Sequence, residues 1–268
     1  MKSKIILFIL GFIFIASLNG CGLMSKKYTK TETVTHQIST DGKKKIKLDN
    51  INGSVTISQS KDSNFLMVKA HKEIKVKKKY LDTPFDEIEV ILDTTGSIIS
   101  VKTEINKKGE DGIFKFNIDR NQRVDYEISV PLNMEIEVEN INGNITAGRL
   151  TDDLKIDLVN GEVSLENYTG LLECEITNGS FSGHIDSTRG MDINTINGSV
   201  TLYLNNYMNA NVRAESVHGK ITNEQLQFHE TIKEKNLFKG KLGSGDSNVD
   251  IKIETVNGKI KLYGRNEI

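Results

Sequence analysis

The feature that most constrains this chain is a dipeptide that returns at a nearly fixed interval. After residue 21, glycine follows asparagine six times and histidine once, at Gly53, Gly143, Gly161, Gly179, Gly198, Gly219 and Gly258. From Gly143 onward the intervals are 18, 18, 19, 21 and 39 residues, and the first interval, 90 residues, is five times 18. Periods near 20 residues are typical of repeat proteins whose units stack on one another.

Aligning the seven copies on their glycine produces three columns that contain only apolar residues. Seven positions before glycine stand Ile46, Ile136, Leu154, Leu172, Met191, Val212 and Ile251. Five positions before stand Leu48, Val138, Ile156, Cys174, Ile193, Ala214 and Ile253, and two positions after stand Val55, Ile145, Val163, Phe181, Val200, Ile221 and Ile260. Because polar residues alternate with these columns, each copy predicts a half-buried strand on both sides of a corner.

The corner itself offers two interpretations. Asn-Gly is a strong signal for a two-residue hairpin, which would bury the residue three before glycine, yet five of these seven residues are polar. The residue two before glycine is apolar in six copies, so the alternation is expected to slip by one at the corner. We therefore expect an all-β fold, a parallel β-solenoid of 18–21-residue coils, with an antiparallel β-meander or sandwich as the alternative. The predicted corner residues are Asn52, Gly53, Asn142, Gly143, Asn160, Gly161, Asn178, Gly179, Asn197, Gly198, His218, Gly219, Asn257 and Gly258.

Residues 1–20 have the layout of a secretory signal peptide, with Lys2 and Lys4 followed by a short apolar run. Residues 18–21, Leu-Asn-Gly-Cys, resemble a bacterial lipoprotein lipobox. The resemblance implies cleavage before Cys21 and acylation of that residue. The sequence therefore predicts a palmitate-bearing lipoprotein held by lipid on the cell membrane or outer membrane, on an extracytoplasmic face.

Beyond the signal peptide, the expected organisation is a lipidated tether over 21–35 and one β-repeat domain over 36–264. Within that domain, residues 61–131 are strand-rich but lack the Asn-Gly spacing. Residues 224–248 are expected to be an insertion and hold the one helix-like stretch, 226–235. Loss of Lys2 and Lys4 would move the formal charge from −1 to −3, which gives no reason to expect nucleic acid as a partner. With Cys21 acylated, Cys174 would have no disulfide partner and is expected in the core.

Two segments resemble the bacterial "putative adhesin" β-repeat family, which is related to the head GIN domain. They are VDYEISVPLNMEIEVENINGNITAGRLTDDLKIDLVNGEVSLENYTGLLECEITNGSFSG and GSGDSNVDIKIETVNGKIKLYG. The resemblance spans roughly residues 36–264, implies a β-repeat fold and a role in adhesion, and brings no catalytic residues. No Gly-x-Ser-x-Gly, Walker loop, dinucleotide motif or calcium-repeat motif is present, so we expect no cofactor, no metal and no enzymatic activity.

Outward-facing columns are the remaining candidates for function. Four positions before glycine, acids occupy six of seven copies: Asp49, Glu139, Asp157, Glu175, Glu215 and Glu254, with Asn194 in the seventh. Three positions after, hydroxyls occupy six: Thr56, Thr146, Ser164, Ser182, Thr201 and Thr222. The simpler interpretation is a solvated strand face; the alternative is a face for a cation or other ligand, formed by Glu139, Asp157, Glu175, Glu215 and Glu254, and calcium is one such cation. The Asp152-Asp153 pair is expected in a loop.

The basic stretch over 69–79 predicts either a charged strand edge or contact with an anionic lipid or polymer. Together these features predict a non-catalytic envelope protein that presents an elongated binding, adhesion or scaffolding surface. Candidate partners are an envelope polysaccharide or another envelope protein. The alternatives are a polysaccharide-active β-helix enzyme and an accessory or sensor protein for envelope stress.

Overall fold

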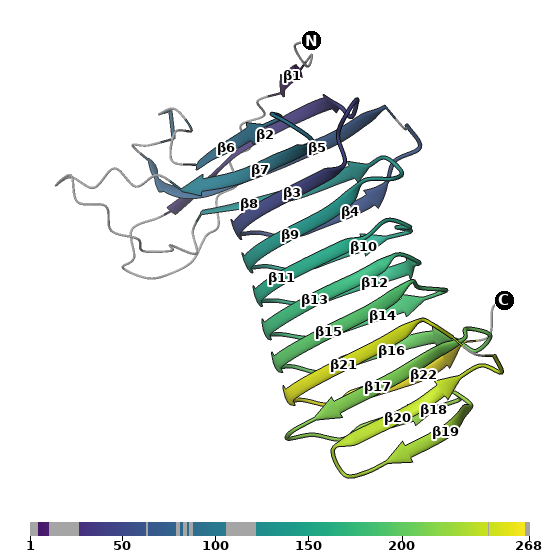
Figure 1. Ribbon diagram of the computed structural model, residues 1–268. Helices are drawn as coiled ribbons and strands as arrows, with labels where there is room; N and C mark the ends of the chain where they lie inside the picture. The colour runs from purple at the N-terminus through teal and green to yellow at the C-terminus, as the bar shows by residue number, and fades with distance from the viewer. Residues whose placement is uncertain are drawn as a thin grey trace.

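The computed structural model describes residues 5–10, 27–62, 64–78, 81–82, 85, 88–105, 122–245 and 247–265. These residues form two 11-stranded sheets that face each other, with no α-helix in the described part (Figure 1). No helix among them is long and apolar enough to cross a membrane. The fold class is therefore all-β, and each sheet contains both parallel and antiparallel pairs.

The first sheet has the strand order β1 (Ile5–Leu10), β2 (Lys27–Ser39), β5 (Phe65–Lys77), β8 (Gln122–Val130), β4 (Val55–Gln59), β10 (Ile145–Gly148), β12 (Val163–Tyr168), β14 (Phe181–Ile185), β16 (Val200–Asn205), β22 (Ile260–Arg265) and β18 (Ile221–Glu224). The second sheet has the order β19 (Phe228–Lys233), β20 (Leu237–Leu242), β17 (Ala210–Ser216), β21 (Asp250–Asn257), β15 (Gly190–Asn197), β13 (Leu171–Asn178), β11 (Leu154–Asn160), β9 (Glu135–Asn142), β3 (Lys45–Asn52), β7 (Ile98–Ile105) and β6 (Ile88–Asp93).

Each glycine-centred copy forms one repeat, consisting of a strand of the second sheet, a corner and a strand of the first sheet. Neighbouring repeats pair in parallel and in register, so that Ile136, Leu154 and Leu172 stand opposite one another. The three apolar columns predicted from the sequence point between the sheets, and nearly all of their members are fully buried. Cys174 lies in this core as a free, buried cysteine, as expected.

The corners join strands that lie in different sheets, so the Asn-Gly dipeptide is not a hairpin turn here. At Gly161, φ is +149°, and a Cβ added there would lie 2.2 Å from the carbonyl oxygen of Gly143. The same contact recurs from corner to corner through the stack. Glycine is therefore required at these positions because each corner packs directly against the backbone of its neighbour.

The asparagines beside these glycines form a ladder of side-chain hydrogen bonds. Asn160 donates through Nδ2 to Oδ1 of Asn142 at 2.9 Å and accepts from Nδ2 of Asn178 at 3.1 Å. The ladder begins at Asn52 and ends at Asn257, which donates to Asn197 at 2.9 Å. The exposed His218 replaces asparagine at the last corner, where the backbone continues to bond to the neighbouring repeat.

The slip predicted at the corner would bury the residue two before glycine in place of the residue three before it. This prediction is wrong. The residue three before glycine is buried in all seven repeats, at Asn50, Asn140, Leu158, Ile176, Thr195, Ser216 and Thr255. The polar members are accommodated because they bond to corner carbonyl groups. Asn140 donates to Gly53 O at 3.1 Å, and Ser216 donates to Gly258 O at 3.0 Å. Hydropathy alone does not detect this use of a buried polar side chain.

The repeats are not stacked in the order in which the chain passes through them. The first repeat, β3 and β4, lies directly against β9 and β10, so the 90-residue interval holds no five hidden repeats. The last repeat, β21 and β22, is inserted between β15/β16 and β17/β18. In Figure 1 the yellow strand β21 accordingly lies among green strands that precede it in the sequence.

Residues 61–131 add strands to the N-terminal end of both sheets. Strands β7 and β8 pair in parallel with β3 and β4, so they continue the stack without an Asn-Gly corner. The 13-residue strand β5 pairs antiparallel with β2 on one side and β8 on the other. Its lysines therefore do not lie on a sheet edge, and Lys72 is buried and paired with Glu32 at 2.8 Å.

At the C-terminal end, residues 224–248 contain the antiparallel hairpin β19–β20, which extends the second sheet beyond β17. The helix-like stretch 226–235 thus contains strand β19, with Phe228 packed against Phe238 at 4.9 Å between ring centroids. At the other terminus, six residues of the predicted signal peptide form β1, which pairs with β2. Cys21 lies outside the described residues, so its acylation stays a prediction.

Candidate binding trough

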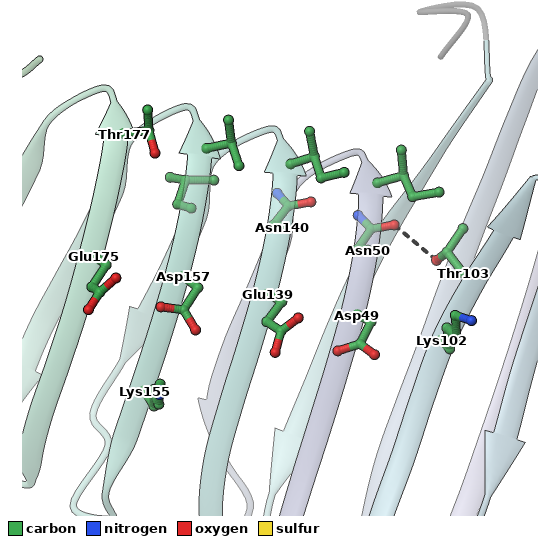
Figure 2. Close-up of a pocket in the computed structure, with 14 residues that line it drawn as sticks. Asp49, Asn50, Lys102, Thr103, Glu139, Asn140, Lys155, Asp157, Glu175 and Thr177 are labelled. Carbon is green, nitrogen blue, oxygen red and sulfur yellow. Dashed lines mark hydrogen bonds between the residues drawn. The ribbon is translucent and has the colours of Figure 1, made fainter. Parts of the chain in front are cut away.

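The acidic column predicted from the sequence is a continuous row across the second sheet. Strand pairing places its members opposite one another in the order Lys102, Asp49, Glu139, Asp157, Glu175, Asn194, Glu254 and Glu215. Figure 2 shows Asp49, Glu139, Asp157 and Glu175 side by side on the outer face of their strands. All five residues proposed as a ligand face, Glu139, Asp157, Glu175, Glu215 and Glu254, are therefore brought into one row.

A second row, of aliphatic side chains, runs parallel to the acids along the corners. It consists of the residues two before each glycine, in stack order Ile51, Ile141, Val159, Thr177, Ile196, Val256 and Val217. Four of them are well exposed, with accessible fractions of 39% for Val159, 50% for Ile196, 40% for Val256 and 54% for Val217. The repeat thus keeps an apolar residue at a solvent-facing position in six of seven copies.

Between the two rows lies a trough, here called the acidic-aliphatic trough. One hollow of about 690 Å³ extends from Lys102 and Thr103 to Glu175 and Thr177. A second hollow of about 420 Å³ begins at the same Glu175 and Thr177 and extends to Glu215 and Val217. The trough therefore crosses eight strands, which corresponds to roughly 34 Å at ~4.8 Å per strand.

The N-terminal end of the trough is neutralised by lysine. Lys47 is paired with Glu139 and lies 3.0 Å from Glu137 and 3.7 Å from Asp49. Hydrogen bonds from Lys45 and Lys47 lower the pKa of Glu137 to about 2. Burial raises the pKa of Asp49, with repulsion from Glu139 adding to the effect and attraction to Lys47 opposing it.

The centre of the trough is less well neutralised. Asp157 and Glu175 form no salt bridge with any residue in the described ranges, whereas Glu254 is paired with Lys252 at 3.0 Å and Glu215 is paired with Arg213. Burial raises the pKa of Asp157; Lys155 opposes this shift, and Glu175 and Glu139 add to it. Negative charge is thus concentrated where the two hollows meet.

The trough has the geometry of a linear surface rather than a cage. Among the described residues, no three His, Cys, Asp or Glu side chains converge so that they could hold a metal ion. The calcium hypothesis therefore finds no multidentate site in this part of the chain. A linear arrangement of acids beside aliphatic side chains suits an extended ligand with cationic and apolar groups.

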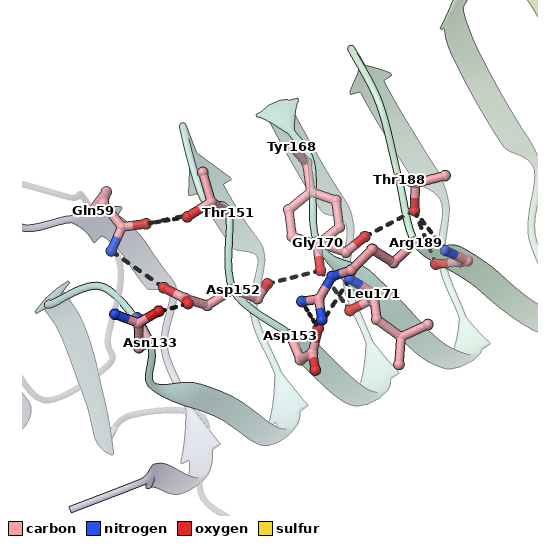
Figure 3. Close-up of polar contacts among 11 residues, drawn as sticks. Gln59, Asn133, Thr151, Asp152, Asp153, Tyr168, Gly170, Leu171, Thr188 and Arg189 are labelled. Atoms are coloured by element: carbon pink, nitrogen blue, oxygen red, sulfur yellow. Dashed lines mark hydrogen bonds and ion pairs between the residues drawn. The ribbon is translucent and has the colours of Figure 1, made fainter. Parts of the chain in front are cut away.

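The Asp152-Asp153 pair lies at the opposite set of turns, where it has a structural role (Figure 3). Asp152 accepts from the backbone N–H of Asn133 at 2.8 Å through one oxygen and from Gln59 at 3.4 Å through the other. Asp153 accepts from the N–H of Leu171 at 3.1 Å and pairs with Arg189. Both carboxylates hold neighbouring turns together, as expected of a loop pair.

Some trough residues were not identified from the sequence. Lys102 and Thr103 lie on β7, which carries no Asn-Gly signal to align it with the repeats. Thr103 donates to Oδ1 of Asn50 at 2.9 Å and lies 2.7 Å from the hydroxyl of Tyr126, which closes that end of the trough. The alignment on glycine shows the aliphatic row, but the slip that it predicts places this row on the buried face.

No protein-family model matches this chain, and no curated protein matches it. Among solved structures, the chain is similar to a "putative cell adhesion protein" from Clostridium sporogenes, with 15% identity, a TM-score of 0.45, and 98% of this chain and 100% of the other covered. A "putative adhesin" from Bacteroides fragilis matches with 13% identity, a TM-score of 0.39 and coverage of 86% and 96%. A "putative lipid binding protein" from Parabacteroides distasonis matches with 12% identity, a TM-score of 0.31 and coverage of 85% and 96%.

Proposed function

We propose that this chain is a non-catalytic, lipid-anchored protein of the cell envelope that uses the acidic-aliphatic trough of a parallel β-solenoid as an elongated binding surface. The observation that carries the proposal is the pair of adjoining hollows that extend from Lys102 to Glu215 and share Glu175 and Thr177. A surface that repeats once per strand offers equivalent contacts to a ligand that lies along the stack. Such a surface suits adhesion to, or scaffolding by, an extended polymer or protein segment.

The solenoid description is supported by strand pairing. Seven repeats pair in parallel and in register in both sheets, and every corner connects one sheet with the other. In a β-sandwich of antiparallel hairpins, sequential strands would pair with each other instead. Antiparallel strands are found at the two ends, where β5, β6, β19 and β20 extend the sheets.

The anchor part of the proposal rests on the sequence Leu18-Asn19-Gly20-Cys21. The experiment is membrane fractionation and intact mass of the Cys21→Ser variant. We expect the variant to be released or to remain unprocessed, because the acyl chains would be missing. A mass and a membrane fraction equal to those of the natural chain would contradict lipid anchoring at Cys21.

The binding part is tested by affinity capture from intact envelopes with the full-length chain and two variants. The trough variant is Asp157→Asn/Glu175→Gln, which removes the two least neutralised acids. The matched control is Glu173→Gln on the same strand β13, an exposed acid that does not line the trough. We expect about tenfold weaker capture by the trough variant and unchanged capture by the control. Equal capture by all three chains would show that the trough is not the binding surface.

One observation favours a second candidate, a polysaccharide-active enzyme. Asp157 and Glu175 are neighbours in the row, and burial raises the pKa of Asp157. Glycosidases use a pair of carboxyl groups, one of which acts as a general acid with a raised pKa. Incubation with envelope polysaccharide followed by an assay for new reducing ends distinguishes the two proposals, because a binding protein releases none.

A further inference from the structure

The structure divides the basic stretch over 69–79 into a paired part and an unpaired part. Lys69 lies 3.2 Å from Glu127, and the buried Lys72 lies 2.8 Å from Glu32. Both lysines therefore have a carboxylate partner within the first sheet. The other lysines of the stretch that the structure describes are all exposed: Lys75, Lys77 and Lys78.

These three exposed lysines have no acidic partner in the described part of the chain. None of its salt bridges involves Lys75, Lys77 or Lys78. Because Val76 between them is buried, Lys75 and Lys77 lie on the outer face of the first sheet. Glu73, two positions before Lys75, is the one acid of β5. Positive charge therefore accumulates toward the end of this strand.

The pairing of β2 with β5 adds a fourth lysine. The antiparallel register sets Lys27 opposite Lys77, and Thr29 opposite Lys75, so no acid of β2 faces these lysines. Residues of like charge directly opposite each other usually destabilise a sheet. This register is therefore unfavourable unless negative charge from outside the sheet faces it. The four residues, here called the basic patch, are Lys27, Lys75, Lys77 and Lys78.

The basic patch lies at the end of the molecule to which the predicted lipid anchor is attached. Strands β2 and β5 belong to the N-terminal end of the stack, opposite to the end formed by β19 and β20 (Figure 1). Lys27 follows Cys21 by six residues. A fully extended chain spans at most ~3.6 Å per residue, so the start of β2 lies within roughly 20 Å of the acylated residue.

We propose that the basic patch docks onto an anionic lipid surface and thereby orients the stack on the membrane. A lysine near an anionic bilayer strengthens binding about fivefold, and salt screens this attraction beyond ~10 Å. Acyl chains hold one point of the chain at the bilayer but do not orient the domain. The proposal rests on the lipid anchor proposed above and does not involve the trough.

The short tether favours a lipid surface over a soluble polyanion as the occupant. An anchor at Cys21 keeps the basic patch within reach of the bilayer at all times, so the lipid headgroups are present at a high effective concentration. A soluble polyanion would have to compete with them. Lysine with acyl chains is also a known pairing of weak and strong membrane signals, in which the charges add to the binding supplied by the lipid.

The first experiment measures amine labelling of the natural chain on two kinds of vesicle. One kind contains phosphatidylcholine alone, and the other also contains about 30% phosphatidylglycerol. At about 0.1 M salt we expect severalfold slower labelling of the exposed patch lysines on the anionic vesicles, and this difference should disappear at about 1 M salt. The internal references are exposed lysines at the opposite end of the stack: Lys220, Lys233 and Lys235.

The second experiment uses the full-length Cys21→Ser chain, in which no acyl group contributes to binding. Its readout is the ratio of the partition constants for anionic and neutral vesicles, which cancels contributions that do not depend on lipid charge. The patch variant is Lys75→Gln/Lys77→Gln/Lys78→Gln. The matched control, which removes the same charge elsewhere, is Lys220→Gln/Lys233→Gln/Lys235→Gln. We expect the ratio to fall at least about tenfold for the patch variant and to change less than about twofold for the control.

The outcomes separate the patch from the anchor. Equal labelling of the patch lysines on both kinds of vesicle, or equal ratios for the patch and control variants, would overturn the proposal. Protection by soluble polyphosphate but not by anionic vesicles would overturn it as well, because the occupant would then be a polymer. Failure of the anchor gives a different result: the natural chain would not sediment with neutral vesicles, and the second experiment would still measure the patch.

Discussion

The repeat stack and the N-terminal region over 61–131 are both strand-rich, yet their strands pair by different rules. In the stack, each corner glycine contacts the corner before it, so Gly161 lies against Gly143 and Gly179 lies against Gly161. This contact leaves one register and one direction for the next repeat. Strand β5 has no such corner and runs antiparallel to both neighbours.

The comparison indicates that the apolar columns alone do not set strand direction, because β5 runs antiparallel to its neighbours whereas β7 and β8 of the same region continue the parallel stack. Alternating apolar residues specify which face of a strand is buried, and both regions have them. They do not specify direction, because an antiparallel strand can bury the same face. Within the seven repeats, the backbone contact between glycines and the asparagine ladder add this information, and parallel pairing with β3 and β4 extends it to β7 and β8.

The largest expected effect comes from a corner glycine. Gly161→Ala places a Cβ 2.2 Å from a backbone oxygen that cannot move independently, so we expect a loss of at least about 4 kcal/mol in the free energy of unfolding. Gly96→Ala is the matched change in the N-terminal region, at φ +66° with no atom within 4 Å of the added Cβ. For Gly96→Ala we expect a loss of about 1 kcal/mol in the free energy of unfolding. Urea unfolding measures both, and equal losses would remove the distinction between the regions.

A charge placed in the core of the stack is expected to lower the free energy of unfolding slightly less than Gly161→Ala does. Cys174→Asp buries a carboxylate where burial already raises the pKa of the thiol, so we expect a loss of about 3 kcal/mol or more. Cys174→Val keeps the apolar character and is expected to change stability by less than about 1.5 kcal/mol. In the natural chain, a bulky maleimide should label Cys174 only after unfolding, and rapid labelling of the folded chain would contradict its core position.

The asparagine ladder allows the loss of one side-chain hydrogen bond to be compared with the loss of two. Asn160→Ala removes two hydrogen bonds of the ladder, whereas Asn257→Ala removes the one bond to Asn197 at the end of the ladder. At about 0.5–1 kcal/mol for each net hydrogen bond, we expect a loss about twice as large for Asn160→Ala. Chemical denaturation of the two variants in parallel provides the ratio. A ratio near one would mean that the ladder bonds do not contribute individually.

The smallest effects should have opposite signs at two acids on neighbouring strands. Glu137 has its pKa lowered to about 2, so its ionised form stabilises the fold above pH 4.5, and this contribution disappears as pH falls toward 2. Asp157 has a raised pKa, so its protonated form stabilises the fold below pH 3.8. This contribution to the free energy of unfolding is lost as pH rises above 3.8 and through the pKa of the folded state. At pH 7 we expect Glu137→Gln to destabilise and Asp157→Asn to stabilise the chain by a few tenths of a kcal/mol.

Unfolding curves at pH 7 and at about pH 3 check these signs. The effect of Asp157→Asn should vanish at low pH, because the natural carboxyl group is then protonated in both states. Part of the effect of Glu137→Gln should remain there. If both substitutions shifted stability in the same direction at pH 7, this result would contradict the electrostatic difference that we describe between the end and the centre of the trough.

Much of the repeat stack could be predicted from the sequence because each copy carries the same signal at the same offset. The buried position of Cys174, the corner glycines and the alignment of Asp157 with Glu175 all follow from one alignment on glycine. The burial of Asn50 and Asn140 could not be predicted, because it depends on carbonyl groups from distant segments, Val124 on β8 for Asn50 and Gly53 at the first corner for Asn140. The expected slip of the alternation implies a buried Ile196, whereas its side chain is exposed.

The parts without the dipeptide were predicted least well. Strand β7 contributes Lys102 to the trough, but only its pairing with β3 reveals this. The stretch 226–235 has helical composition and forms edge strand β19, since the hairpin with β20 provides its hydrogen-bond partners. In both cases a contact between distant segments decides the structure, and no local pattern records that contact.

The inserted position of β21 and β22 has a consequence for biosynthesis. The ribosome synthesises β21 and β22 after the strands that flank them on both sides. During translation β15 and β16 therefore present an unpaired strand edge. The next repeat to be synthesised, β17 and β18, also has a glycine corner and could pair with this edge. A chain that stacked in the order of synthesis would pair β17 and β18 with β15 and β16 and close the position that β21 and β22 occupy. Completion of the native stack thus depends on keeping that edge open until β21 and β22 have been made.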